Sequence, residues 1–508
     1  MLTLMSTLLI ATLALLGWYL YNFYTYWKRR GVLQETPLPL VGNYMGAGTK
    51  YHMRDINQRL YRKFKGKAPF AGTYVFVRKV ALILDLDLIK NILIKDFSNF
   101  HDRGGFNNVE DDPLTGHLVA LDGEQWRAMR TKLSPVFTSA RMKYMFHTVV
   151  KVGERFTQVM GEELAKSSDQ ILEIRDLCAR FTTDVIGTCA FGIECNSLKD
   201  PNAEFRQKGR DILTRPRHNT LIQLFTLTNG QLAKKLGMKL FPDDLTDFFM
   251  NVIRQTVDYR LKNNVKGNDF MDLLIEMKAK DEEMARASKG IDLSHGLTIE
   301  QMAAQTFVFF LAGFDTSSTT MAFALYELAC NQKIQDELRN EILDSLKLSQ
   351  GELTYEGLHG MQYLEQVIAE TLRKYPVLSV LVRVTKNDYK VPNSSHVIER
   401  DILAAIPVYA MHHDPQYYDN PEEFRPSRFT PSECEKRHPS TYLPFGDGPR
   451  NCIGLRFGKM QAKIGLVSLL RQYRFECCPK TDIPLELDKK NVLAAPKGGI
   501  YLKIVPLS

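Results

Sequence analysis

The sequence predicts a mainly α-helical protein with small β-sheets, preceded by one N-terminal transmembrane helix. Apolar residues recur at the spacing of amphipathic helices over residues 137–255 and again over 455–470. Only short stretches, such as residues 73–84 with a turn at Arg78 and Lys79, have the β-branched and aromatic composition typical of strands. The first 27 residues carry no charged side chain, and this length is sufficient to cross a bilayer.

The size and composition indicate one large domain behind the membrane segment. No linker rich in Pro, Gly or Ser divides the 508 residues. The formal net charge of +8 is modest, and no dense basic tract indicates nucleic-acid binding. The 8 cysteines include no C-x-x-C pair, so we expect reduced cysteines in a cytosolic domain and no zinc site. The expected segments are a membrane anchor at 1–27, a basic flank and proline hinge at 28–43, and a single domain at 44–508.

Basic residues set the expected orientation of the anchor. Lys28, Arg29 and Arg30 directly follow the apolar run, and basic residues favour the cytoplasmic side of a membrane. The rest of the chain should therefore be cytosolic. A cleaved signal peptide is the alternative, but the sequence has no basic segment before its long apolar run. Pro37 and Pro39 should then form a short, stiff hinge.

A single cysteine lies in a glycine-containing loop at residues 444–454, called the cysteine loop below, just before an apolar-periodic helix. Glycine lets the main chain approach a bulky group closely, and a thiolate held by backbone N–H groups can be an axial metal ligand. A buried structural cysteine is the alternative for Cys452. Gly446 and Gly448 begin like the nucleotide fingerprint G-x-G-x-x-G, but Asn451 replaces the third glycine and excludes that motif.

A long apolar helix is expected from Thr298, which forms a capping box with Gln301, to residue 331. Its only charge between residues 301 and 326 is Asp315. The length would also suit a second membrane span, but a run of hydroxyl side chains and polar ends favour a helix buried in a large protein. The Thr316 hydroxyl can compete for a carbonyl one turn back, and Asp315 can relay protons. A buried ion pair is the alternative for Asp315.

The cysteine loop resembles the haem-binding loop of the cytochrome P450 superfamily. Phe445, Gly448, Arg450, Cys452 and Gly454 reproduce its pattern F-x-x-G-x-R-x-C-x-G. The resemblance implies the cytochrome P450 fold, in which haem lies between a long central helix and a loop whose cysteine thiolate ligates the iron. It therefore implies that the large domain is a haem-thiolate monooxygenase domain with haem (iron protoporphyrin IX) as its cofactor.

Further motifs follow in the order of that family. Trp126 and Arg130 match W-x-x-x-R, although in isolation they would form a cation–π contact. Glu370 and Arg373 match E-x-x-R, although such pairs are usually surface salt bridges. Arg383 interrupts an apolar strand, which is costly unless its charge is paired. The resemblance assigns haem contacts to Cys452 (the axial iron ligand), Trp126, Arg130, Ala312, Arg383, Phe445, Gly446, Arg450 and Gly454, catalytic roles to Asp315 and Thr316, and structural roles to Glu370, Arg373 and Arg428.

Apolar side chains beside the oxygen-activation signature at residues 312–316 predict a lipophilic substrate pocket. The candidates are Phe307, Phe310, Phe314, Val377, Leu378 and Leu381. Aromatic residues at this density are equally typical of a core. A finer likeness, in residues 26–31 and 445–450, resembles the insect family-six members. It implies plant toxins and insecticides as substrates, whereas endogenous hormones or fatty acids would be expected otherwise.

The resemblance also implies a membrane-bound enzyme that oxidises lipophilic small molecules with dioxygen. The sequence has no flavin or nicotinamide fingerprint, so the electrons should come from NADPH-cytochrome P450 reductase, assisted by cytochrome b5. The expected location is the endoplasmic reticulum membrane. Candidates for a basic docking face are Arg127, Lys132, Lys143 and Lys459, which could equally be solvated surface residues.

Two other functions remain open at this point. One is a haem-thiolate isomerase or dehydratase that uses no dioxygen, against which the neighbouring acid and alcohol of Asp315 and Thr316 argue. The other is a haem-bearing protein that binds hydrophobic ligands without catalysis. Consumption of NADPH that a ligand stimulates, together with an oxidised product, would separate an enzyme from a binder.

Overall fold

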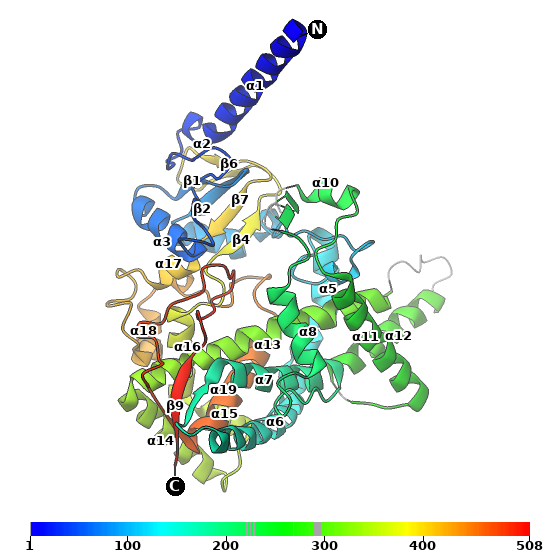
Figure 1. Ribbon diagram of the computed structural model, residues 1–508, viewed down its shortest axis with the longest axis vertical. Coiled ribbons are helices and arrows are strands. Elements are labelled where there is room, and N and C mark those ends of the chain that lie inside the picture. The colour runs from blue at the N-terminus through cyan, green and yellow to red at the C-terminus, as the bar shows by residue number, and fades with distance from the viewer. Residues whose placement is uncertain are drawn as a thin grey trace.

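The computed structural model describes residues 2–219, 222–223, 225–226, 229–267, 269–287 and 296–507. Met1 of the expected anchor and Ser508 of the expected domain lie outside these ranges. The described chain is mainly helical with small sheets, as the sequence predicts (Figure 1).

The secondary structure is as follows. The helices are α1 (Leu2–Tyr24), α2 (Tyr26–Arg29), α3 (Met53–Phe64), α4 (Leu86–Lys90), α5 (Gly123–Leu133), α6 (Ser139–Lys166), α7 (Ile174–Ile186), α8 (Glu204–Thr214), α10 (Gly230–Lys235), α11 (Asp243–Asn263), α12 (Phe270–Ala287), α13 (Ile299–Cys330), α14 (Gln332–Leu348), α15 (Tyr355–Gly360), α16 (Gln362–Lys374), α17 (Val408–His412), α18 (Pro431–Glu435) and α19 (Leu455–Leu470). The strands are β1 (Phe70–Val75), β2 (Arg78–Ile83), β3 (Ile171–Glu173), β4 (Leu381–Val384), β5 (Tyr389–Lys390), β6 (Val397–Ile398), β7 (Leu403–Ile406), β8 (Tyr473–Glu476) and β9 (Tyr501–Pro506). Two π-helical turns are η1 (Asn91–Lys95) and η5 (Gly187–Phe191), and a 3₁₀ turn is η7 (Pro426–Phe429).

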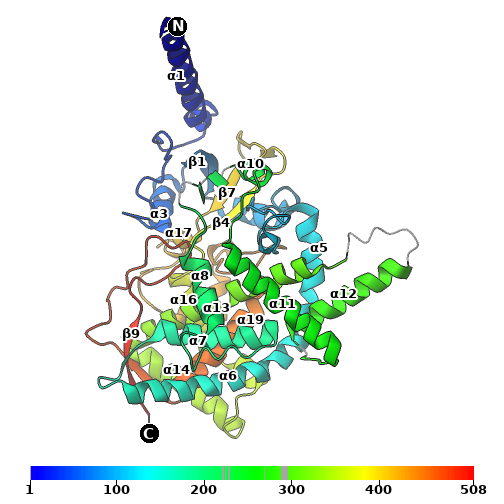
Figure 2. The same ribbon diagram turned by 45° about the vertical axis from the view of Figure 1, so that its right-hand side comes forward.

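Helix α1 projects from one end of the molecule, and the sheet of β1, β2, β7 and β4 lies directly below it (Figure 1 and Figure 2). Helix α13 crosses the middle of the helical part, where it packs against α7 and α19. A second sheet, in the order β3-β9-β8, lies near the C-terminus at the opposite end from α1. The molecule therefore has a β-rich end beside the projecting helix and a helical body around α13.

The larger sheet mixes parallel and antiparallel pairs. Strand β1 pairs with β2 in antiparallel register, and Val75 stands opposite Arg78. The turn consequently lies at Phe76 and Val77, and Phe76 has a φ of 52°; the predicted turn at Arg78 and Lys79 is wrong by two residues. Strand β7 then runs parallel to β2 and antiparallel to β4. This arrangement places Arg383 of β4 opposite Ala404 in the interior of the protein.

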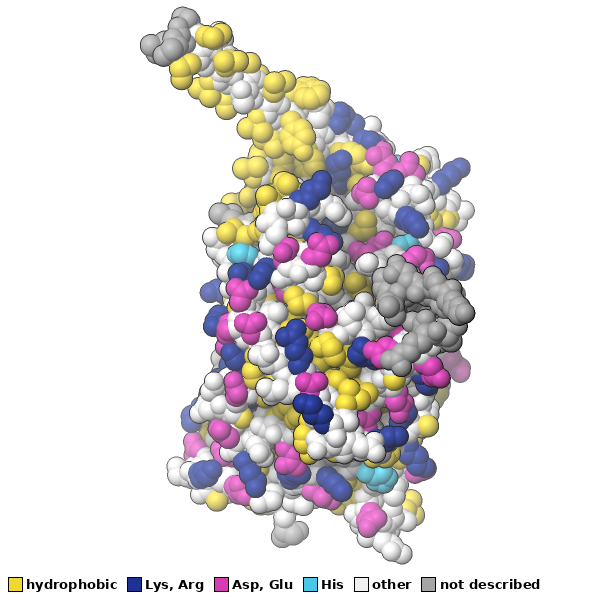
Figure 3. Space-filling model, turned by 90° about the vertical axis from the view of Figure 1, so that its right-hand side faces the viewer, with side chains coloured by type: hydrophobic (Ala, Val, Ile, Leu, Met, Phe, Trp, Pro, Cys, Tyr) yellow, Lys and Arg dark blue, Asp and Glu magenta, His cyan; other side chains and the backbone are white. Residues whose placement is uncertain are grey.

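Two helices are long and apolar enough to span a membrane among the described residues, and burial separates them. The apolar window of Leu4–Tyr24 contains no buried residue, although Tyr24 at its end is buried, whereas the window of Ile299–Cys330 is mostly buried. Helix α13 begins at the expected capping box, since the Thr298 hydroxyl accepts from the backbone N–H of Gln301 at 3.1 Å. The prediction of a buried central helix is confirmed. Hydrophobic side chains cover much of the projecting helix α1 (Figure 3).

The exposed apolar helix is shorter than the predicted anchor at residues 1–27. Trp27 is fully buried, and its indole N–H donates to the carbonyl of Thr73 at 3.2 Å. A side chain at Gly72 would collide with the Trp27 ring, so the glycine leaves room for it on β1. Composition alone could not show this boundary, because an aromatic residue suits the membrane interface and a protein core equally.

The predicted hinge at residues 28–43 runs along the β-rich end. The backbone N–H of Gly72 donates to Leu33 at 2.8 Å, and that of Asn43 donates to Tyr74 at 2.9 Å. Arg30 forms an ion pair with Glu399 at 2.6 Å. This segment therefore connects α1 to the domain through repeated backbone and side-chain contacts.

Glu370 and Arg373 of α16 form a fully buried ion pair with an N–O distance of 2.7 Å. Arg428 of η7 donates to the same carboxylate at 3.3 Å, as does the backbone N–H of Arg425 at 2.9 Å. Arg373 also donates to the carbonyl of His412 at 2.9 Å. These contacts connect α16 to the segments before the cysteine loop, where the carboxylate and both guanidinium groups satisfy one another.

Replacing Arg373 with Ala should lower the free energy of unfolding by about 3 kcal/mol, because the buried Glu370 carboxylate would lose its nearest guanidinium and keep only the more distant Arg428. Chemical denaturation of the detergent-solubilised protein measures this change. The matched control is Lys347→Ala, which removes an exposed ion pair to Asp344 and should change stability by about 0.5 kcal/mol or less. Equal effects of the two substitutions would contradict the structural role of the buried pair.

Candidate active site

The cysteine loop makes a tight turn directly before α19. The Cys452 N–H donates to the carbonyl of Phe445 at 2.8 Å, and the Asn451 N–H donates to Gly448 at 3.1 Å. Gly448 has a φ of +71°, and a Cβ there would lie 1.8 Å from the carbonyl oxygen of Leu93. This glycine is therefore required by both its backbone conformation and its close contact with η1.

The thiol of Cys452 is accessible, yet burial raises its pKa. Both observations agree if the sulfur faces a space enclosed by the protein and distant from bulk water. The backbone N–H of Gly454 and the positive charges of Arg130 and Arg103 act in the opposite direction on this pKa. These groups would stabilise a thiolate, which is the form that binds a metal.

Helix α13 presents one accessible face within its buried length. Val308, Ala312 and Thr316 are spaced by four residues and share this face; Ala312 is exposed and the other two are half-buried. The Thr316 hydroxyl donates to the carbonyl of Ala312 at 2.5 Å, as the sequence predicts. Gln461 of α19 donates to the next carbonyl, that of Gly313, at 3.1 Å. The backbone of α13 is thus engaged by side chains at the predicted oxygen-activation signature.

Asp315 lies on the buried side of α13 and forms an ion pair with Arg175 of α7 at 3.1 Å. Burial raises the pKa of Asp315, and the positive charges of Arg175 and Arg206 limit this rise. Arg175 is partly exposed, with 29% of its side chain accessible, so it connects the buried carboxyl to solvent. Asp315 therefore forms the buried ion pair that the sequence leaves open as the alternative to proton transfer. Its contact with a partly exposed arginine also suits proton transfer.

Arg103, Arg130, Arg383 and Arg450, called the arginine cluster below, come together beside the cysteine loop. Arg103 donates to the carbonyl of Arg450 at 3.1 Å, and Arg130 donates to the Asn451 carbonyl at 3.0 Å. The guanidinium of Arg450 lies 4.8 Å from the ring centre of Trp126. The structure thus brings together the predicted haem-binding residues of three separate parts of the chain.

The charges of the arginine cluster are compensated unevenly: Arg450 lies 3.3 Å from a carboxylate oxygen of Asp122, whereas Arg383 forms no ion pair among the described residues. Burial and the charges of Arg103 and Arg450 lower the pKa of Arg383 to about 9. Burial and Arg450 likewise lower the pKa of Arg103 to about 10. The Nε atoms of Arg383 and Arg450 are buried and have no hydrogen-bond partner among the described residues. A group with two carboxylates, such as the haem propionates, fits this donor set, and the thiol of Cys452 fits its iron.

Three of the predicted pocket residues belong to the packed core. Phe307, Phe310 and Phe314 have almost no accessible surface, so the prediction that they line a pocket is wrong. The ring of Phe310 lies 5.0 Å from that of Phe205, and the ring of Phe307 lies 5.1 Å from that of Phe249. The helical period explains the error, because a residue two positions from Ala312 lies about 200° around the helix.

The strand candidates differ among themselves. Val377 is buried, Leu381 is half-buried, and 42% of the Leu378 side chain is accessible. Leu378 also forms a backbone bridge to Leu493, which brings the C-terminal segment beside β4. Leu378, Leu381 and Val308 are therefore better candidates for contact with an apolar ligand than the phenylalanines of α13.

The predicted docking residues all form ion pairs. Arg127 lies 3.3 Å from Glu124, Lys132 lies 2.6 Å from Asp281, and Lys143 lies 2.5 Å from Glu356. Lys459 pairs with Glu365, which also binds Lys463. Recruitment of an acidic partner would have to compete with these pairs.

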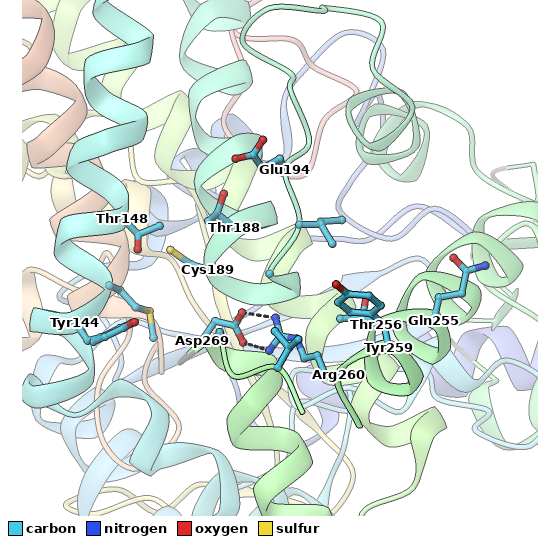
Figure 4. Close-up of a pocket in the computed structure, with 15 residues that line it drawn as sticks. Tyr144, Thr148, Thr188, Cys189, Glu194, Gln255, Thr256, Tyr259, Arg260 and Asp269 are labelled. Atoms are coloured by element: carbon cyan, nitrogen blue, oxygen red, sulfur yellow. Dashed lines mark hydrogen bonds and ion pairs between the residues drawn. The ribbon is translucent and has the colours of Figure 1, made fainter. Parts of the chain in front are cut away.

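A separate cavity of about 510 Å³ lies between α6, η5 and α11 (Figure 4). An ion pair between Arg260 and Asp269, with an N–O distance of 2.6 Å, stands at its centre in this view. None of the predicted site residues lines this cavity. It is therefore distinct from the candidate active site.

Sequence reasoning missed two residues of the site. Arg103 lies in an aperiodic polar stretch, where an arginine carries no signal that distinguishes it from a solvated one. Arg175 lies on an amphipathic helix 140 residues before its partner Asp315, and pairing over such a separation has no local pattern. Both contacts depend on the folded arrangement.

The thiol of Cys452 and the unpartnered Nε atoms of Arg383 and Arg450 suit a haem-thiolate protein, in which a cysteine binds the iron and basic groups bind the propionates. The family model of cytochrome P450 matches residues 33–504 of this chain. The chain belongs to the cytochrome P450 family, and it is a haem-thiolate monooxygenase.

Two similar relatives come from flies. The chain is 60% identical to "Probable cytochrome P450 6a14" of Drosophila melanogaster over 486 residues, which is 95% of this chain and 96% of the relative. It is 50% identical to "Cytochrome P450 6A1" of Musca domestica over 485 residues, or 94% of this chain and 93% of the relative. These relatives confirm the predicted likeness to insect family six.

Replacing Gly448 with Ala should prevent stable haem incorporation, because the new Cβ would overlap the Leu93 carbonyl oxygen. The ratio of haem absorbance to protein absorbance after purification measures this loss. The control is Gly360→Ala in α15, away from the cysteine loop, where an added Cβ would meet nothing within 4 Å. Comparable haem content in the two variants would contradict the steric explanation.

Replacing Arg175 with Leu should destabilise the fold by about 2 kcal/mol at neutral pH, less than for a fully buried pair because Arg175 is partly exposed. Since the pKa of Asp315 is raised in the folded protein, the stability from this group is full below the pKa of the unfolded carboxyl. The contribution of Asp315 to the free energy of unfolding decreases as the pH rises towards the pKa of this carboxyl in the folded protein. This decrease should be larger in Arg175→Leu than in the unaltered protein. Unfolding at several pH values measures this.

The double variant Arg175→Leu/Asp315→Asn is the matched control for that pH dependence. It has no buried charge at this place, so most of the lost stability at neutral pH should return. A destabilisation by Arg175→Leu that is equal at acidic and neutral pH would show that the ion pair has no part in it.

Proposed function

We propose that this monooxygenase oxidises lipophilic xenobiotics, such as insecticides and plant toxins, at the endoplasmic reticulum membrane with electrons from NADPH-cytochrome P450 reductase. The main support is α13, where the Thr316 hydroxyl lies on the accessible face with Ala312 and the neighbouring residue Asp315 places its carboxyl on the buried side beside Arg175. An acid and an alcohol at this place suit an enzyme that must deliver protons to dioxygen. The similarity to insect family six supports the class of substrate.

The residues that would hold the haem follow from the geometry of the site. Cys452 would ligate the iron, and the arginine cluster with Trp126 would hold the propionates. When bound, haem supplies the activation of dioxygen, which no side chain of the protein can provide. The protein contributes the orientation of this group and its separation from water.

Proton delivery is assigned to Asp315 with Thr316. The Asp315 carboxyl can exchange a proton with solvent beside the partly exposed Arg175, since a raised pKa lets it hold a proton closer to neutral pH. The Thr316 hydroxyl, which now donates to Ala312, can turn to donate into the accessible space. Both residues therefore act as proton-handling groups.

The projecting helix supports a membrane location. Helix α1 carries no charge, and the basic residues Lys28, Arg29 and Arg30 follow it at the domain side. Basic residues favour the cytoplasmic face, so we place the domain in the cytosol beside the membrane. Reductase and cytochrome b5 would reach it from the same side.

The carbon-monoxide difference spectrum of the reduced protein tests the iron ligand. The unaltered protein should show the absorption of thiolate-ligated haem, and Cys452→Ser should lose it while the fold persists. The matched control is Cys434→Ser, which changes an exposed cysteine outside the cysteine loop and should leave the spectrum unchanged. Thiolate-type absorption in Cys452→Ser would exclude this residue as the ligand.

Turnover of a lipophilic library with reductase and NADPH tests the activity. Thr316→Ala should still consume NADPH but should form less oxidised product for each NADPH consumed, because protons would reach dioxygen less reliably. Conversion without dioxygen would support the isomerase or dehydratase instead. Binding without stimulated NADPH consumption for any compound would support a non-catalytic binder.

A further inference from the structure

Two cysteines that the active site does not use meet at the end of α13. Cys330 is the last residue of this helix, and Cys477 directly follows β8. Their sulfur atoms lie 3.3 Å apart, although 147 residues separate them in the sequence. Both are free thiols, and Cys330 is exposed while Cys477 is half-buried. The pair is therefore reachable by small solutes.

Glutamine side chains hold the two segments in this position. Gln332 donates to the carbonyls of Ala329 and Phe475, each at 2.8 Å. Gln335 donates to the same Phe475 carbonyl at 2.8 Å and accepts from the Phe475 N–H at 2.9 Å. The backbone on both sides is thus fixed, and the C-terminal sheet lies beside α14 in both ribbon views (Figure 1 and Figure 2).

We propose that Cys330 and Cys477 are a redox-responsive pair that forms a reversible disulfide when the protein meets a peroxide. The sulfur atoms need to approach by only about 1 Å to reach the length of an S–S bond, which rotation of the side chains can provide. Because the glutamines hold the neighbouring backbone, the side chains of Cys330 and Cys477 would have to provide this approach.

The chemistry balances with hydrogen peroxide as the oxidant. The Cys477 sulfur attacks the O–O bond to give a sulfenic acid and one water. The Cys330 sulfur then attacks the Cys477 sulfur, the S–S bond forms, and a second water leaves. Two thiols lose two electrons in total, and one peroxide gains them. A cellular dithiol would reverse the reaction by thiol–disulfide exchange.

The two thiols share one contact, and burial together with the hydrogen bond from Cys477 raises the pKa of the Cys330 thiol. Cys330 is exposed and Cys477 is half-buried. Attack in the opposite order, with Cys330 oxidised first, gives the same disulfide and the same two waters.

The bond would connect the helix of the active site to the C-terminal sheet. Helix α13 carries Ala312, Asp315 and Thr316, and β8 pairs with β9. The disulfide would close a covalent ring of residues 330–477, which contains the cysteine loop. Local unfolding of the haem-binding part would therefore be restricted. We expect the oxidised protein to unfold at a higher temperature and to lose haem more slowly.

Cys478 offers a competing reaction and also the matched control. It is adjacent to Cys477, but its sulfur contacts the Thr481 hydroxyl at 3.4 Å and the Tyr501 carbonyl at 3.7 Å. A disulfide between Cys477 and Cys478 would leave Cys330 free. The two disulfides are therefore distinguishable by the cysteines that remain reactive.

The experiment treats the full-length haem-loaded protein with hydrogen peroxide, blocks the remaining thiols with a maleimide, and identifies the peptides by mass spectrometry. We expect a Cys330–Cys477 peptide pair lacking two hydrogen atoms, which dithiothreitol separates again. It should be absent in Cys330→Ser and Cys477→Ser and retained in Cys478→Ser. The melting temperature should rise on oxidation only where the pair forms.

Several outcomes would overturn the proposal. Equal maleimide labelling of Cys330 before and after peroxide would show that it does not react. A Cys477–Cys478 product, or sulfinic acid at Cys477 without a bond to Cys330, would show that the neighbouring thiol does not capture the intermediate. Maleimide labelling and the oxidised peptides are measured on the unaltered protein. The test therefore depends neither on the folding of a variant nor on turnover of any substrate.

Discussion

Guanidinium groups enclosed together in a protein interior repel one another and lose their hydration, so they require an anionic partner. Arg383 meets this condition beside the cysteine loop, where its pKa is lowered to about 9, and Arg450 meets it only in part because Asp122 lies 3.3 Å away. Much of the surrounding structure holds these groups in place: β4 carries one, and the loop carries the other. The fold is thereby arranged around a prosthetic group with carboxylates on one side and a metal at its centre.

Local sequence patterns predicted the parts of this arrangement that depend on short spacing. The capping box at Thr298, the hydroxyl bond of Thr316 and the ion pair of Glu370 with Arg373 all involve residues within four positions of one another. Their geometry is determined by the helix itself. The resemblance of the cysteine loop supplied the fold, which periodicity alone could not have given.

The remaining features depend on which helix faces which neighbour. The composition of α13 predicts a pocket lined by its phenylalanines, whereas the helical period places Phe310 and Phe314 away from Ala312. Apolar composition could not reveal this, because a core and a pocket select the same side chains. Arg103 in its polar loop could be found only from the folded structure.

The burial of Trp27 has a mechanical consequence for the whole molecule. Because this indole fills the space above Gly72 and donates to Thr73, the base of α1 is fastened to the β-rich end. The direction in which the helix leaves the domain is then a property of the fold and not of a loose tether. Once α1 is inserted in a bilayer, its tilt would dictate which surface of the catalytic body rests against the lipid.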